Sequence, residues 1–87
     1  MKILWDEEKN YKLKSERGVG FEDVASRILH GEIIDIMKNP TRGGQYYFII
    51  NLNQYIHVVP FMTGEDEIIL KTIYPSRKYH KKYGGIK

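Results

Sequence analysis

The sequence predicts an α+β domain in which N-terminal helices pack on one face of a mainly antiparallel sheet of four or five strands, with a short helix at the C-terminus. Three observations favour this class. Apolar residues recur at helical spacing only in the first third of the chain, β-branched and aromatic runs fill the middle, and a Pro-Ser pair precedes a short basic segment. A chain of 87 residues suits one domain, residues 1–87, with a small core.

The two N-terminal helices are predicted from their boundary residues. Asp6 is a good N-cap for a polar helix that runs to about Arg17, and Gly18 supplies the left-handed stop. The second helix starts at Phe21 and ends at Gly31. One apolar stripe runs along it and contains Phe21, Val24, Ala25, Ile28 and Leu29. We expect this stripe to pack on the sheet.

The strands are predicted from apolar runs that turn residues separate. They are Lys2–Trp5, Ile33–Met37, Tyr46–Leu52, Tyr55–Phe61 and Glu67–Tyr74. The second of these runs fits a third helix nearly as well as a strand. A tight turn centred on Asn53 makes an antiparallel hairpin of the two long middle strands, and Met62–Asp66 forms the next turn.

The last expected strand carries one lysine among apolar residues. In a regular strand Ile69, Lys71 and Ile73 share one side, and Ile68, Leu70 and Thr72 share the other. Because an unpaired lysine is costly to bury, the side with Lys71 is expected to face solvent or a ligand. The sheet face away from the two helices is expected to be partly open.

Positive charge is concentrated near the end of the chain. Residues 71–87 carry six Lys/Arg and no acidic residue, whereas residues 1–70 carry eight Lys/Arg against eleven Asp/Glu. Ser76 is a plausible N-cap for the short basic helix that follows Pro75. Cations without neutralising carboxylates suit a polyanion, and RNA is the first candidate. A solvated basic helix that serves solubility is the alternative.

Several other kinds of site have no support in the sequence. The chain has no cysteine, and the spacing of His30, His57 and His80 does not match a zinc site. Neither a phosphate-cradling glycine loop nor a nucleophile motif is present, so we expect no cofactor and no metal. No apolar run approaches the roughly 20 residues that span a bilayer, and no signal peptide opens the chain, so a cytoplasmic protein without membrane contact is expected.

Three short motifs stand in a defined order along residues 3 to 83. They are the Trp5-Asp6-x-x-Lys9 opening, the Gly18-Val19-x-Phe21-Glu22 link and the Ser76-Arg77-Lys78 close. Together they resemble the BrnT-type toxins. The resemblance implies a RelE/ParE-like fold and a ribonuclease toxin of a type II toxin–antitoxin system. It also implies a cognate antitoxin, usually a ribbon-helix-helix DNA-binding protein, and allows a dimer of toxin–antitoxin heterodimers.

Metal-independent RNA cleavage needs a base for the 2′-hydroxyl proton, a cation for the phosphate and an acid for the 5′-oxygen. The catalytic candidates are Arg77, Lys71, His80 and Tyr74. By the resemblance, Arg77 is the fixed cation at the scissile phosphate; its alternative role is a salt bridge to the acidic first helix. His57 is expected to be a half-buried structural residue. The RNA-binding candidates are Lys78, Tyr79, Lys81, Lys82 and Tyr83.

Two positions depart from the family pattern. Glu16-Arg17-Gly18 stands where the family usually has Lys-His-Gly. Thr72 stands where an arginine of the closing strand would lie, although a one-residue shift makes Lys71 the substitute. These departures motivate an alternative hypothesis, a catalytically weak or inactive module of the same fold that binds RNA or protein. In either case the antitoxin is expected to cover Lys71, Arg77 and Lys78.

Overall fold

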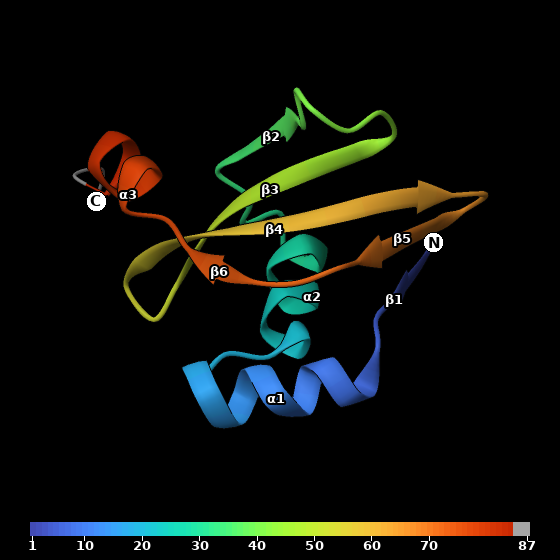
Figure 1. Cartoon of the computed structure of the whole chain (residues 1–87), viewed down its shortest axis with the longest axis horizontal. Helices are drawn as coiled ribbons and strands as arrows, with labels where there is room; N and C mark the ends of the chain where they lie inside the picture. Colours follow the sequence, from blue (N-terminus) through green and yellow to red (C-terminus); the bar gives the residue numbers. More distant parts are fainter. Residues whose placement is uncertain (85–87) are drawn as a thin grey trace.

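The computed structural model describes residues 1–84 as three helices and a six-stranded sheet (Figure 1). The elements are β1 (Lys2–Leu4), α1 (Glu7–Arg17), α2 (Phe21–Leu29), β2 (Asp35–Lys38), β3 (Gln45–Leu52), β4 (Tyr55–Gly64), β5 (Glu67–Leu70), β6 (Tyr74–Pro75) and α3 (Arg77–Tyr83). The α+β class is confirmed. The segment that fitted a strand or a third helix is the strand β2.

The strands form one sheet in the order β1-β5-β4-β3-β2, and β6 also pairs with β4. Only β1 and β5 run in parallel; the other pairs are antiparallel. The β3–β4 hairpin closes through Asn53 and Gln54, whose φ angles of 53° and 64° are those of a type I′ turn. The predicted turn at Met62–Asp66 is wrong in extent, because β4 continues to Gly64 and pairs it with Glu67.

The sheet has a packed cluster on each face. The larger cluster lies under α1 and α2 and contains Leu13, Val19, Phe21, Val24, Phe48, Ile50, Leu52, Val59, Phe61, Leu70 and Ile73. The smaller one contains Ile49, Ile56 and Val58, against which Met37, Tyr47, Tyr74, Tyr79 and Tyr83 pack. The second face is therefore covered in part by α3. The expected stripe of α2 is confirmed from Phe21 to Ile28, which packs against the larger cluster, but it is wrong at Leu29, which is 76% exposed.

The last expected strand is broken in two, and the break changes which residues face the core. Phe61 pairs with Leu70, but Val58 pairs with Tyr74, so three residues of this strand stand opposite two of β4. Such a bulge reverses the alternation of side chains. Ile73, which was expected beside Lys71 on the open side, is fully buried in the larger cluster, whereas Lys71 is exposed as predicted.

The bulge has a cause in β4. The Pro60 carbonyl accepts a hydrogen bond from the Lys71 N–H at 2.9 Å. The backbone polar positions of Pro60 therefore face the last strand. Proline has no N–H to return, and the ladder loses a bond at that point. The strand consequently separates from β4 after Leu70 and rejoins it at Tyr74 in a shifted register.

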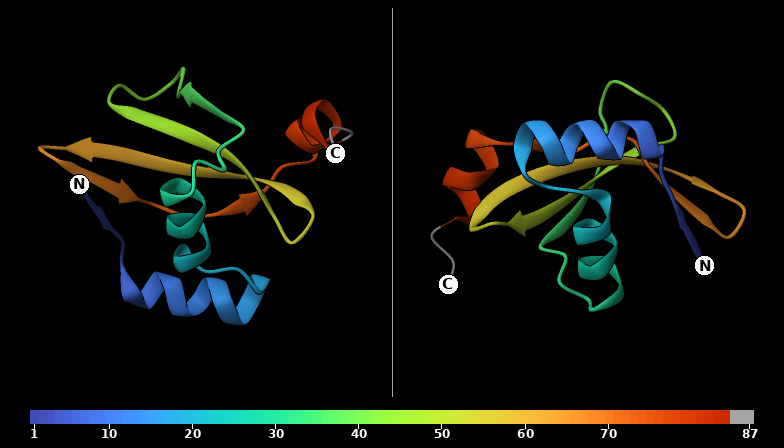
Figure 2. Two further views of the ribbon diagram at one scale, coloured as in Figure 1. Left: turned by 180° about the vertical axis from the view of Figure 1, so that it is seen from behind. Right: turned by 90° about the horizontal axis from the view of Figure 1, so that it is seen from below.

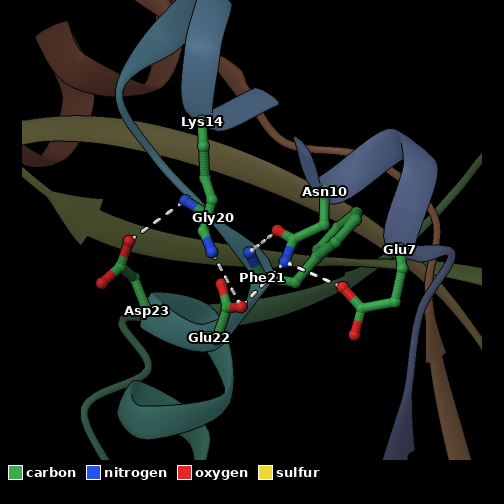
Figure 3. Close-up of polar contacts among 7 residues, drawn as sticks. All are labelled: Glu7, Asn10, Lys14, Gly20, Phe21, Glu22 and Asp23. Atoms are coloured by element: carbon green, nitrogen blue, oxygen red, sulfur yellow. Dashed lines mark hydrogen bonds and ion pairs between the residues drawn. The ribbon is translucent and has the colours of Figure 1, made fainter. Parts of the chain in front are cut away.

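A buried asparagine joins the first two helices (Figure 3). The first residue of α2, Phe21, follows Gly20, which has no side chain to cap the helix. Asn10 of α1 takes that place, because its Oδ1 accepts the Phe21 N–H at 2.7 Å. Its Nδ2 donates to Glu22 at 2.9 Å, and the Asp23 carboxylate accepts the Gly20 N–H at 3.1 Å. The polar helix α1 is thereby fixed to the rest of the domain.

Candidate functional site

The basic C-terminal helix has cations on its outer side and aromatic rings on its inner side. Ser76 caps α3 as predicted, since its Oγ accepts the Tyr79 N–H at 3.2 Å. Tyr79 and Tyr83 pack on the smaller cluster, and the Tyr83 hydroxyl donates to Asp35 at 3.0 Å. The exposed side carries Arg77, Lys78, Lys81 and Lys82. We call these four residues the α3 cations; Lys87, the last residue of the basic segment, lies outside the described residues.

Two lysines of α3 place their ammonium groups over the rings of neighbouring tyrosines. The Tyr79 and Tyr83 ring centroids are 6.3 Å apart. Lys78 Nζ lies 5.2 Å from the Tyr79 centroid, and Lys82 Nζ lies 5.3 Å from the Tyr83 centroid. Each ammonium group thus meets the electron-rich region of a ring that is itself packed on the sheet. The two rings are half-buried, which limits how far they can stack on RNA bases.

The structure separates the two best cation candidates, Lys71 and Arg77. The Lys71 N–H binds the Pro60 carbonyl, and the N–H of Ser76, just before Arg77, binds the Ile56 carbonyl. These anchors are four positions apart along β4, so the attached backbones are about 13 Å apart. Arg77 forms no ion pair with α1 among residues 1–84, so the alternative role considered for it is not observed there.

Tyr74 lies on the α3 side of the sheet and packs in the smaller cluster. Burial raises its pKa above the ordinary value of 10.0, and the neighbouring phenols of Tyr47 and Tyr79 raise it further. The hydroxyl therefore stays protonated at neutral pH and can donate a hydrogen bond. It is not a base under those conditions.

His80 is half-buried and packs against the end of β4. Its ring stacks on Tyr55 with centroids 4.0 Å apart, and its Nδ1 accepts the Ile56 N–H at 3.3 Å. A backbone N–H can only donate, so Nδ1 carries no proton and the ring hydrogen sits on Nε2. His80 therefore offers a donor at Nε2, while its lone pair at Nδ1 is already engaged.

His57 shows the opposite tautomer. Its Nδ1 is 2.8 Å from the Tyr55 carbonyl, which can only accept, so Nδ1 carries the proton and Nε2 keeps a lone pair. The side chain is 7% exposed, more buried than the sequence suggested. Burial is the main reason that its pKa lies below the ordinary 6.5; the bond to Tyr55 raises the pKa, and the nearby Arg17 charge lowers it again.

Arg17 brings the end of α1 to the same region. Its guanidinium donates to the Ile73 carbonyl at 2.5 Å, within the bulge between β5 and β6. The His57 ring meets Tyr55 edge-on at 6.1 Å, so the two imidazole centroids are at most about 10 Å apart across Tyr55. The end of α1, the β3–β4 turn and α3 all lie toward one end of the molecule (Figures 1 and 2). We call Arg17, Tyr55, His57 and His80 the histidine cluster.

A shallow groove of about 560 Å³ follows α1 and reaches Arg17 and Thr72. Its other lining residues are Asp6, Glu8, Lys9, Tyr11, Lys12, Leu13 and Glu16. Its lining has three acidic and three basic side chains, so the groove has no net preference for a polyanion. The α3 cations remain the better candidate surface for RNA.

Comparisons of the chain with protein-family models, curated proteins and solved structures find no match. In the described part of the chain, the helices are too short or too polar to cross a membrane. No cluster of three or more His, Cys, Asp or Glu suited to a metal occurs within residues 1–84. Function is therefore inferred from the α3 cations and the histidine cluster.

Proposed function

We propose that this chain is the toxin of a type II toxin–antitoxin system, a metal-independent endoribonuclease that inhibits translation in the cytoplasm. The observation that carries the proposal is the outer side of α3, where Arg77, Lys78, Lys81 and Lys82 are exposed and no acidic residue occurs from position 71 onward. Such a surface binds phosphates with release of counterions.

The contacts that fix α3 to the sheet support a role in positioning phosphate rather than in solubility alone. The helix is capped by Ser76, and Tyr79, His80 and Tyr83 attach it to the sheet. Cations on a fixed helix lose less conformational freedom on binding than cations on a free tail. The order of two helices, an antiparallel meander and a C-terminal helix also supports assignment to the RelE/ParE-like fold.

In this proposal Arg77 holds the scissile phosphate, because it begins α3 at the side nearest β6 and is exposed. The guanidinium can bind two phosphate oxygens at once. Lys71, about 13 Å away along the sheet, contacts a neighbouring part of the RNA. His80 Nε2 and the Tyr74 hydroxyl serve as hydrogen-bond donors to the reacting group.

The test is expression of the chain alone in bacteria, with growth and RNA integrity followed after induction. We expect growth arrest and cleaved RNA, and a loss of cleavage of about 10²-fold or more in Arg77→Ala. Arg27→Ala is the matched control, because Arg27 is a half-exposed arginine of α2 that pairs with Glu32 and belongs to neither the α3 cations nor the histidine cluster. Normal growth with intact RNA, from folded protein, would exclude the nuclease.

A second candidate is a binding module of the same fold without turnover. One observation favours it: the lone pair of His80 at Nδ1 is occupied by a backbone N–H, and Tyr74 is held protonated, so neither predicted group is a free base. Steep salt dependence of RNA binding without any cleavage would support the module. Cleavage that disappears in Arg77→Ala would exclude it.

The proposed partner is a cognate antitoxin, of the ribbon-helix-helix DNA-binding type, that covers the α3 cations. An acidic helix or strand laid over Lys78 and Lys81 would remove the charges that RNA needs, and opposite charges would speed association. Antitoxin and RNA should therefore compete. We propose that the assembly is a dimer of toxin–antitoxin heterodimers, which light scattering of the purified complex would detect.

A further inference from the structure

His57 has a chemical property that none of the predicted site residues shares. Its Nδ1 hydrogen is committed to the Tyr55 carbonyl, so the neutral ring presents an unprotonated Nε2. Among residues 1–84 no buried side-chain nitrogen or oxygen lacks a partner, and Nε2 has no hydrogen bond there. Nε2 therefore keeps some contact with solvent.

We propose that His57 is the general base that takes the 2′-hydroxyl proton during RNA cleavage, with the Arg17 guanidinium beside it as a cation for the phosphate. This assignment rests on the proposed ribonuclease function. The general base is then His57 of the central strand β4 rather than His80 of α3. The backbone carbonyl of Tyr55 fixes both the tautomer and the position of the His57 ring.

The groups around His57 suit this role. Arg17 approaches from α1 and is held by the Ile73 carbonyl through one nitrogen, which leaves its other N–H groups for a ligand. Tyr55 lies edge-on from the same strand, and His80 of α3 stacks on the Tyr55 ring. The two imidazoles therefore present complementary atoms, an acceptor at Nε2 of His57 and a donor at Nε2 of His80.

The chemical step balances with water as the only co-reactant. The 2′-hydroxyl proton moves to Nε2 of His57 while the 2′-oxygen bonds to phosphorus. The bond between phosphorus and the 5′-oxygen breaks, which leaves a 2′,3′-cyclic phosphate on one fragment. The departing 5′-oxygen takes a proton from a water molecule, and the hydroxide so formed removes the proton from His57.

The proposal is tested with His57→Asn in the full chain, because the asparagine amide can still donate to the Tyr55 carbonyl but cannot act as a base. His30→Asn is the matched control, a histidine at the exposed end of α2. Folding is checked by thermal melting, RNA binding by titration, and cleavage with an RNA oligonucleotide over pH 4 to 9. The ring tautomer of His57 in the wild type is measured by long-range proton–nitrogen NMR.

We expect His57→Asn to bind RNA as the wild type does but to cleave it about 10²–10⁴-fold more slowly. The decrease of wild-type kcat/KM at acid pH should be absent from the variant. Cleavage and pH profile unchanged in folded His57→Asn would overturn the role of His57 and leave the proposed nuclease standing. A proton on Nε2 in the NMR experiment would also overturn it. A wild type that cleaves no RNA would overturn both proposals.

Discussion

Replacing Asn10 with alanine should destabilise the domain more than any exposed change in α1. Asn10 is 1% exposed, and its Oδ1 is the acceptor for the Phe21 N–H at the start of α2 (Figure 3). Loss of that acceptor leaves a buried donor without a partner, which costs about 1–3 kcal/mol. The lost bond to Glu22 adds about 1 kcal/mol at most, because that carboxylate is half-exposed and water replaces the amide.

The expected decrease in the free energy of unfolding is therefore about 3 kcal/mol. For a domain of this size it corresponds to a decrease in Tm of roughly 12–24 °C. Thermal and urea denaturation followed by circular dichroism measure it. Tyr11→Ala is the matched control, because Tyr11 is the next residue of the helix and is 74% exposed; its change should stay within about 0.5 kcal/mol.

Acidification gives an independent check of the same network. The Asn10 hydrogen bond is the largest cause of the lowered pKa of Glu22, ahead of Lys14. A carboxylate with a lowered folded-state pKa adds stability above its unfolded value of 4.5, and that stability is lost as the pH falls below it. The difference in the free energy of unfolding between the wild type and Asn10→Ala should therefore be smaller at pH 3 than at pH 7.

Asn10→Asp separates the acceptor role from the donor role. Its carboxylate can still accept the Phe21 N–H, but it places a negative charge beside Glu7 and Glu22. We expect it to be destabilised at neutral pH and to recover on acidification. If Asn10→Ala unfolds within about 0.5 kcal/mol of the wild type, the reasoning about the unpaired Phe21 N–H is wrong.

Three further predictions concern the C-terminal region. Lys78→Glu combined with Lys81→Glu should weaken both the RNA and the antitoxin complexes and reduce their salt dependence; unchanged antitoxin affinity and salt slope would show that it binds elsewhere. Ser76→Ala removes the α3 cap and should lower the free energy of unfolding by about 1 kcal/mol in urea melts. The lowered pKa of His57 means that the unfolded chain takes up the extra proton first, so stability should decrease as the pH falls below 6.5. Urea melts of His57→Asn should lack this decrease; an equal slope in both proteins would exclude His57 as its source.

The N-terminal half of the fold could be predicted because its signals are local. Asp6 caps α1 and Gly18 ends it with φ of +70°, as the sequence indicated. The cap of α2 could not be predicted in the same way, because its acceptor comes from Asn10, eleven residues earlier on another helix. The available signal was a glycine at the expected N-cap, which implies that some other group must satisfy the first N–H.

The candidate site was predicted in composition but not in geometry. The exposed α3 cations follow directly from the basic sequence after Ser76. The pairing of His57 and His80 through Tyr55 depends on how a helix packs across the end of a strand, which no spacing in the sequence encodes. For this reason the sequence alone predicted only a structural role for His57.

The break in the last strand shows how one residue can change the assignment of a whole face. Local alternation was correct from Ile68 to Lys71, and an unbroken ladder would have carried it to Ile73. The interruption originates in Pro60 on the neighbouring strand, which has no N–H for its partner. Because the bulge buries Ile73 and turns its carbonyl to Arg17, it also positions the guanidinium beside His57. A proline in a central strand is thus the sequence feature that accounts for the place of Arg17 in the histidine cluster.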